Sequence, residues 1–147
     1  MTWSILRKYL IASHGKFASG LKSSIKILTG RTDIETIDAY LDGSEDKNNL
    51  DTKLNKFINS LSDDDCGIIF TDLIGGSVNR EVMVKVNEIK NVVVITSVNL
   101  PTVMSILLDT DDNPSEAHLK HLISESPVQI SKLESKSPDI SDDDFLA

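Results

Sequence analysis

The stretch Tyr9–Gly30 has the sequence YLIASHGKFASGLKSSIKILTG and contains the change of pattern that decides the fold. A short apolar run ends in small residues at Ser13, and beyond Gly15 the apolar residues recur at helical spacing. They are Ala18, Leu21, Ile25 and Leu28. Gly30 then supplies the glycine that commonly follows the last turn of a helix. The stretch predicts a strand, a tight turn and a helix.

Two further pairs of strand and helix follow in the middle of the chain. The segment Asp33–Tyr40 is short and polar, which favours a strand near the edge of a sheet. Ser44 precedes two acidic residues and an apolar stripe, a pattern that predicts the start of a second helix. The run Gly67–Thr71 is almost continuously apolar, as in strands that a parallel sheet buries on both faces. The loop Gly75-Gly76-Ser77 then opens a third helix.

The last third of the chain continues the same alternation. The run Val92–Thr96 predicts another buried strand, and Pro101 stands where a first helical residue would, ahead of the short apolar helix Val103–Leu108. Asn113 and Glu116 have the spacing of a capping box. They predict the start of a last helix.

The alternation of strands and helices predicts an α/β fold, with an open, mainly parallel four-stranded sheet and helices on both faces. Val128–Ile130 is a candidate for a short additional edge strand. We expect an N-terminal extension over residues 1–7, one domain over residues 8–130, and a disordered acidic tail or linker over residues 131–147.

Charge and composition exclude several classes of function. The formal net charge of −8 would repel a phosphate backbone, which disfavours nucleic acid and favours a partner with a basic patch. Cys66 is the single cysteine, so neither an intrachain disulfide nor a multi-cysteine metal site can form. No apolar run approaches the roughly 18 to 20 residues that span a bilayer. We therefore expect a cytoplasmic protein.

Three polar side chains are predicted to lie along one edge of the sheet. His14, Asp72 and Asn99 each come directly after a predicted strand. Open parallel sheets place their sites beyond the carboxyl ends of the strands. This rule turns three distant sequence positions into one candidate site.

His14 is the candidate nucleophile of this site. A histidine between a buried strand and a helix is rigidly held yet open to solvent, and its unperturbed pKa near 6.5 leaves it largely neutral at physiological pH. Asp72 could accept a hydrogen bond from Nδ1–H and so leave Nε2 with a free lone pair. Two plainer interpretations stay open, since a loop histidine is often only solvated and an aspartate often only caps a turn.

The loop Gly75-Gly76-Ser77 is the candidate phosphate-binding element. The first N–H groups of a helix lack partners within it and form an anion site, to which the Ser77 hydroxyl would add a donor. No Walker lysine or dinucleotide fingerprint follows the loop. We expect no metal and no cofactor here, and we interpret His118 and His121 as solvated.

These residues resemble a known family, the enzyme IIA components of the mannose class of the bacterial phosphoenolpyruvate-dependent sugar phosphotransferase system (PTS). The resemblance covers roughly Lys8 to Ile130. Its most specific pieces are Leu10–Gly15 (LIASHG), Asp72–Ser77 (DLIGGS) and Val98–Pro101 (VNLP).

The resemblance implies that His14 is the phosphorylated histidine and that Asp72 orients it. Gly75, Gly76 and Ser77 match the phosphate-contacting loop, and Asn99 and Pro101 match a supporting loop. Many members have a proline directly after Gly-Gly-Ser, whereas this chain has Val78.

The partners that the resemblance implies are proteins. The phosphocarrier HPr would donate the phosphoryl group, a IIB component would accept it, and the membrane components IIC and IID would be served indirectly. Members are commonly homodimers that exchange a late short strand, for which Val128–Ile130 is the candidate. The chain ends soon after it, which favours a free-standing IIA protein.

Two other functions fit the same residues. One is the phosphotransfer subunit of a dihydroxyacetone kinase, and the other is a regulatory module controlled by phosphohistidine. A flavodoxin-like domain with an incidental histidine is the purely structural alternative.

Overall fold

Four parallel strands form one sheet in the order β2-β1-β3-β4. The computed structural model describes residues 6–41 and 47–133. The strands are β1 (Arg7–His14), β2 (Ile34–Ala39), β3 (Cys66–Thr71) and β4 (Val92–Ile95). The helices are α1 (Phe17–Thr29), α2 (Lys47–Asn59), α3 (Ser77–Val86), α4 (Leu100–Leu108) and α5 (Glu116–Ser124). The predicted α/β class is confirmed.

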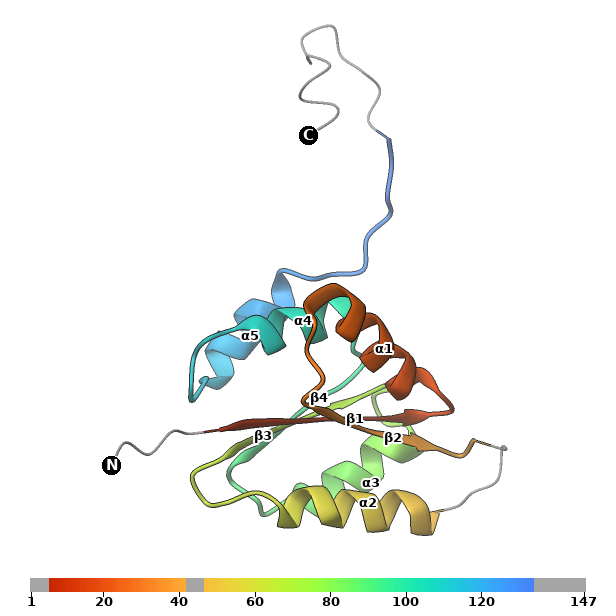
Figure 1. The fold of residues 1–147 in the computed structure, drawn as a ribbon, viewed down its shortest axis with the longest axis vertical. Helices are drawn as coiled ribbons and strands as arrows, with labels where there is room; N and C mark the ends of the chain where they lie inside the picture. The colour runs from red at the N-terminus through yellow and green to blue at the C-terminus, as the bar shows by residue number, and fades with distance from the viewer. Residues whose placement is uncertain (1–5, 42–46, 134–147) are drawn as a thin grey trace, which may run out of the picture.

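The sheet lies between two layers of helices. Helices α1, α4 and α5 cover one face, and α2 and α3 cover the other (Figure 1). Each face has its own apolar core, and β1 supplies both, because successive residues of a strand point to opposite faces. Tyr9 and Ile11 lie in the core under α1, whereas Leu10 and Ala12 lie in the core over α2 and α3. This double burial explains the continuous apolar run that the sequence shows.

The two edges of the sheet differ in how well they are covered. β2 is an edge strand, as its polarity predicts, and β4 forms the other edge. Val92, Val93 and Val94 stay half-buried on β4. The continuous apolar run there predicted a fully buried strand, so an edge strand is a correction to that interpretation.

Other local predictions also need correction. β1 begins at Arg7, two residues earlier than the apolar run suggested. Leu28 in the last turn of α1 is exposed, because Ala18, Leu21 and Ile25 occupy the inner face of the helix.

The start of the last helix differs from its predicted capping box. Ser115, and not Asn113, is the N-cap of α5, and its hydroxyl accepts a hydrogen bond from the His118 N–H. Both residue types cap helices well, so spacing alone did not decide between them. The predicted cap at Ser44 lies outside the described residues.

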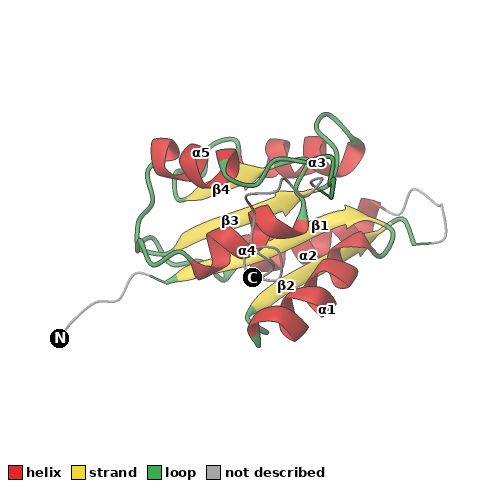
Figure 2. Cartoon of the chain, turned by 90° about the horizontal axis from the view of Figure 1, so that it is seen from above, coloured by secondary structure: helices red, strands yellow, loops and turns green. Residues whose placement is uncertain are grey.

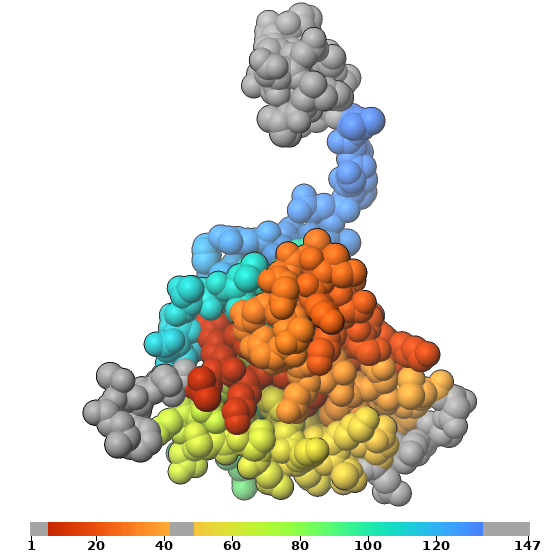
Figure 3. All heavy atoms as spheres, in the orientation of Figure 1, coloured from red at the N-terminus to blue at the C-terminus, as the bar shows by residue number. Residues whose placement is uncertain are grey.

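The segment after α5 leaves the layers instead of pairing with them. The segment begins against the domain, where Asn99 holds the Ser126 carbonyl, and then runs away from its body (Figures 1 and 3). In this single chain Val128–Ile130 forms no strand, and the Val128 and Ile130 side chains are 90% and 85% exposed. The exchange of this segment between two subunits stays a prediction.

Candidate functional site

The candidate site lies at the carboxyl edge of the sheet, where all four strands end on the same side (Figure 2). His14 is the last residue of β1, Asp72 follows β3, and Ser77 is the first residue of α3. Neighbouring parallel strands bring His14 to Asp72 and Ser77, although about sixty residues separate it from them in sequence.

The His14 imidazole makes a polar contact on each of its nitrogens. Nδ1 lies 2.9 Å from Asp72 Oδ2, and Nε2 lies 3.0 Å from the Ser77 Oγ. An ionised carboxylate can only accept hydrogen bonds, so in the neutral ring Nδ1 carries the proton. Nε2 is then the unprotonated nitrogen, and it accepts a hydrogen bond from the Ser77 hydroxyl. The His14 side chain is 40% exposed.

The Asp72 carboxylate is held ionised by its donors. Burial raises the pKa of Asp72, but hydrogen bonds from the His14 N–H, the His14 ring and the Leu73 N–H outweigh burial and lower the pKa below its ordinary value. The His14 N–H donates over 2.8 Å to Asp72 Oδ2. The same oxygen therefore fixes both the backbone and the ring of His14.

The turn that carries His14 is closed by hydrogen bonds to its neighbours. Gly15 has φ +56 and donates its N–H to the Ala39 carbonyl over 2.7 Å. The side chains of Ser13 and Asp38 accept hydrogen bonds from the first turn of α1, from the N–H groups of Ala18 and Ser19. Sequence analysis assigned no role to Ser13 or Asp38; only the pairing of β1 with β2 brings Asp38 to this helix.

The glycine loop is tightly organised around Asn79. Gly75 has φ +73, and its N–H donates to Asn79 Oδ1, while the Gly76 N–H donates to the Leu73 carbonyl. A Cβ on Gly76 would lie 3.2 Å from the Leu73 Cβ and 3.7 Å from the His14 Cε1. The loop thus needs glycine for close approach, and its contact with a phosphate stays a prediction. The N–H groups in the first turn of α3, beginning with that of Ser77, have no carbonyl partner within the helix.

Asn79 is a second residue that sequence analysis missed. It is 7% exposed and donates through Nδ2 to Thr71 Oγ1 over 3.0 Å. It therefore ties Gly75 to the end of β3, directly before Asp72. Nothing in the sequence pattern separates it from an ordinary exposed helix residue.

Tyr40 completes the surroundings of the imidazole. Its ring centroid lies 5.3 Å from that of His14, with the planes tilted by 39°. Its φ is +56, a conformation that costs a non-glycine residue about 1–3 kcal/mol. No sequence signal marked it apart from its place directly after β2.

Asn99 and Pro101 lie at the same edge, at the start of α4. Asn99 Oδ1 accepts the Thr102 N–H, and its Nδ2 donates to the Ser126 carbonyl. Pro101 stands in the first turn of α4. Asn99 therefore caps α4 and anchors the segment after α5. The supporting role expected for Asn99 and Pro101 at the site stays a prediction.

The other two histidines lie on α5. His118 is partly exposed and contacts Asp109 over 2.9 Å, an aspartate that also binds Arg7. The exposed His121 pairs with Glu125. Within residues 6–41 and 47–133, no group of three His, Cys, Asp or Glu side chains could hold a metal ion. None of the helices described is long and apolar enough to cross a membrane.

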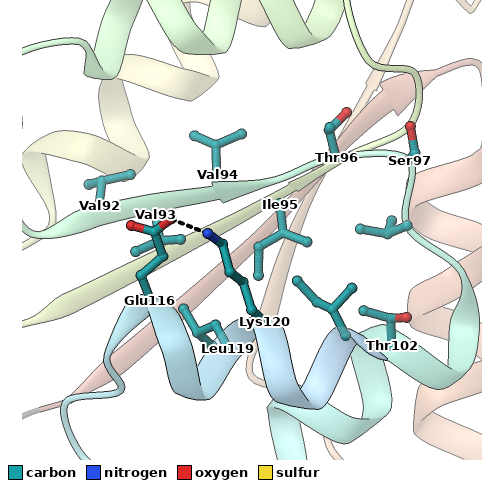
Figure 4. Close-up of a pocket in the computed structure, with 12 residues that line it drawn as sticks. Val92, Val93, Val94, Ile95, Thr96, Ser97, Thr102, Glu116, Leu119 and Lys120 are labelled. Carbon is teal, nitrogen blue, oxygen red and sulfur yellow. Dashed lines mark ion pairs between the residues drawn. The ribbon is translucent and has the colours of Figure 1, made fainter. Parts of the chain in front are cut away.

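A separate groove of about 510 Å³ lies between β4 and α5. Figure 4 shows Leu119, Glu116 and Lys120 of α5 opposite Val93 and Ile95 of β4. Glu116 and Lys120 form an ion pair over 3.0 Å. His14 does not line this groove, so it is distinct from the candidate site around His14.

Comparisons with known proteins show which family and which solved structures this chain is similar to. The family model EIIA-man, described as PTS system fructose IIA component, matches residues 8–123. A Klebsiella pneumoniae protein, provisionally assigned as a phosphoenolpyruvate-dependent sugar PTS permease, is 26% identical. Its structure has a TM-score of 0.70, covering 84% of this chain and 88% of that one.

Two more distant structures share the fold. The mannose/sorbose-specific IIA subunit of Enterococcus faecalis is 18% identical with a TM-score of 0.72, covering 90% of this chain and 100% of that one. The PTS IIA protein associated with the fucose utilization operon of Streptococcus pneumoniae is 22% identical with a TM-score of 0.66, covering 87% and 96%. No curated protein sequence matches the chain.

Proposed function

This chain belongs to the EIIA-man family of PTS IIA components, and we propose that it is a phosphocarrier in which His14 takes a phosphoryl group from HPr and passes it to a IIB component. The observation that carries the proposal is the pair of contacts on the His14 ring. Asp72 holds the proton on Nδ1, and the lone pair of Nε2 is left at an exposed position beside a helix N-terminus.

The accepting step forms one bond and breaks another. The Nε2 lone pair of His14 attacks the phosphorus of the donor's phosphohistidine, an Nε2–P bond forms, and the donor's N–P bond breaks with its electron pair returning to the donor nitrogen. The ring keeps its Nδ1 proton and becomes positively charged. The Asp72 carboxylate stabilises that charge.

Ser77 has to change partners during this step. Its hydroxyl donates to Nε2 in the free protein, so that bond must break before Nε2 can bind phosphorus. The released hydroxyl and the first N–H groups of α3 can then donate to the phosphoryl oxygens. Glycine at position 76 lets the loop approach closely.

The donating step reverses this chemistry toward a second protein. A nucleophile of the IIB component attacks the same phosphorus, the Nε2–P bond breaks, and its electron pair returns to Nε2. A carrier must hold the phosphoryl group only moderately, because a tight clamp would stop turnover. The negative charge of Asp72 near the phosphoryl group limits that stabilisation.

The surroundings of His14 favour a protein as donor. Apolar side chains are exposed in the three loops at this edge, namely Phe17, Leu41, Leu73 and Ile74. Clustered exposed apolar side chains are typical of surfaces that contact other proteins. With a net charge of −8, the chain favours partners with a basic patch. We place this exchange in the cytoplasm, with IIC and IID served through IIB.

The proposal is tested by intact-mass spectrometry after incubation with phosphoenolpyruvate, enzyme I and HPr, omitting each component in turn. We expect a gain of one acid-labile phosphoryl group that requires all three. Adding a IIB component should remove it. No gain with active HPr would contradict the phosphocarrier function.

We also propose that two copies form a homodimer by exchanging the segment around Val128–Ile130. β4 pairs with β3 alone among the described residues and leaves a strand edge beside the groove. Val128, Ile130 and Leu133 are exposed apolar residues on the segment that leaves the domain. An open edge and an exposed extended segment suit strand addition.

The dimer predicts a change of mass in solution. The wild-type protein should sediment as a dimer at micromolar concentration, and the double variant Val128→Asp, Ile130→Asp as a monomer, because two charges would enter an apolar groove. Val84→Asp, at another exposed apolar position on α3 at the opposite face, should stay dimeric. A monomeric wild type in sedimentation analysis would refute the exchange.

A further inference from the structure

Tyr40 has an unusual backbone at the edge of the candidate site. Its φ of +56 lies in the left-handed region, which bulky L-residues rarely adopt. It directly follows Ala39, the residue of β2 that pairs with His14. Glycine or asparagine would adopt this conformation with less strain. Residues with a strained backbone cluster at functional sites, where the strain holds a side chain in the position that the function needs.

The Tyr40 side chain is half-buried and faces the imidazole. The two ring centroids are 5.3 Å apart, within the usual range for aromatic pairs, and the 39° tilt brings the rings together obliquely. Tyr40 also packs against the apolar core over α2 and α3. The Tyr40 ring therefore packs against both the apolar core and the His14 imidazole.

The contact with Tyr40 differs in kind from the two hydrogen bonds of His14. Those bonds run from the ring nitrogens to Asp72 and Ser77. The Ser77 bond must break when Nε2 binds phosphorus, so at that moment a single polar contact would restrain the ring. A ring held only through Nδ1 can pivot about that bond. The packing contact of Tyr40 does not depend on the Nε2 lone pair and persists through the transfer.

We infer that Tyr40 is a positioning residue, whose aromatic ring holds the His14 imidazole in line for transfer while Ser77 releases Nε2. This inference rests on the proposed phosphocarrier function. Small losses of alignment at a reacting atom slow a reaction strongly. The role belongs to the ring and not to the phenolic hydroxyl.

Three variants separate this role from its alternatives. Tyr40→Phe keeps the ring, Tyr40→Leu keeps apolar bulk and the backbone strain without a ring, and Ile27→Ala removes an exposed apolar side chain near the far end of α1. We measure the rate of transfer from phospho-HPr in reactions quenched at set times. We expect Tyr40→Leu to lower kcat about 10-fold and to keep KM within about 2-fold of wild type. Tyr40→Phe and Ile27→Ala should keep kcat within about 2-fold of wild type.

A spectroscopic comparison tests the contact without any phosphoryl donor. The Tyr40 ring current should shift the carbon-bound proton resonances of the His14 imidazole in NMR spectra. We expect these resonances to keep their positions in Tyr40→Phe and to move in Tyr40→Leu. Thermal unfolding of each variant verifies that it is folded. If Tyr40→Leu does not fold, Tyr40→Phe still decides the test, because a 10-fold lower kcat in Tyr40→Phe would contradict a role of the ring alone.

The inference and the proposed function fail in different ways. A wild type that accepts no phosphoryl group refutes the function, and the NMR comparison still tests the ring, because unchanged His14 resonances in Tyr40→Leu would refute the positioning role. A wild type that is phosphorylated, together with a Tyr40→Leu variant of unchanged kcat, refutes the inference alone. A loss confined to KM would also overturn it, since it would make Tyr40 a contact of the partner.

Discussion

Replacement of His14 with alanine is expected to lower phosphoryl acceptance from HPr by at least about 10³-fold, to the level of the background. The reason is that the transferred group bonds to Nε2 itself. No other nitrogen nucleophile is assigned to this place, and the Ser77 hydroxyl is a much weaker nucleophile without a base beside it. The measurement is the rate of acid-labile mass gain in the reconstituted donor chain.

Two further histidine variants sharpen this result. His14→Asn keeps a polar group near the position of Nδ1, which can still contact Asp72, but it lacks Nε2, so its acceptance should be lost equally. His121→Ala is the matched control, because His121 is exposed and pairs only locally with Glu125 on α5. It should accept at the wild-type rate. Acceptance by His14→Ala at a rate near that of wild type would exclude His14 as the phosphorylated residue.

The elements that the sequence predicted well are those whose burial is decided locally. In β1 and β3 both faces are covered by helices, so the central residues must be apolar, and the runs Tyr9–Ala12 and Ile68–Phe70 are visible without any knowledge of neighbours. The position of His14 then follows from chain order, since parallel strands end at one edge. The contact of His14 with Asp72 was predictable for the same reason.

The residues that sequence analysis missed depend on register and loop conformation. Asp38 reaches the first turn of α1 because Ser13 pairs with it across β1 and β2. Tyr40 meets His14 because its backbone adopts a positive φ. Neither relation leaves a periodic trace in the sequence. The interaction of His118 with Asp109 is of the same type, since it joins a helix to a preceding loop.

The C-terminal segment shows a different limit. Val128–Ile130 has the composition of a strand, yet a strand needs a partner, and within the described residues of the single chain this segment pairs with none. Val128 and Ile130 are among the most exposed large apolar side chains of the described residues. A sequence pattern can indicate that a segment suits a strand without indicating whether its partner belongs to the same chain.

Replacement of Asp72 is expected to slow phosphoryl acceptance by about 10²-fold or more without abolishing it. Asp72→Ala removes the group that keeps the proton on Nδ1, so part of the neutral His14 would carry its proton on Nε2 and be unreactive. Asp72→Asn should be at least as slow as Asp72→Ala, because its amide can donate to Nδ1 and favour the unreactive tautomer. Transfer rates from phospho-HPr measure both, and an asparagine variant as fast as wild type would exclude an orienting role.

The stability of the Asp72 variants gives an independent test through pH. Hydrogen bonds from His14 and Leu73 lower the pKa of Asp72 in the folded protein despite its burial, so the ionised carboxylate contributes stability above the ordinary carboxyl pKa of about 4. That contribution is lost as the pH falls through the lowered pKa of the folded state. The excess in Tm of wild type over Asp72→Asn should therefore be present at about pH 5 and shrink below about pH 4. If the excess instead grew as the pH fell below about 4, the carboxylate would be destabilised in the fold, and it could not be the fixed anion that holds the Nδ1 proton of His14.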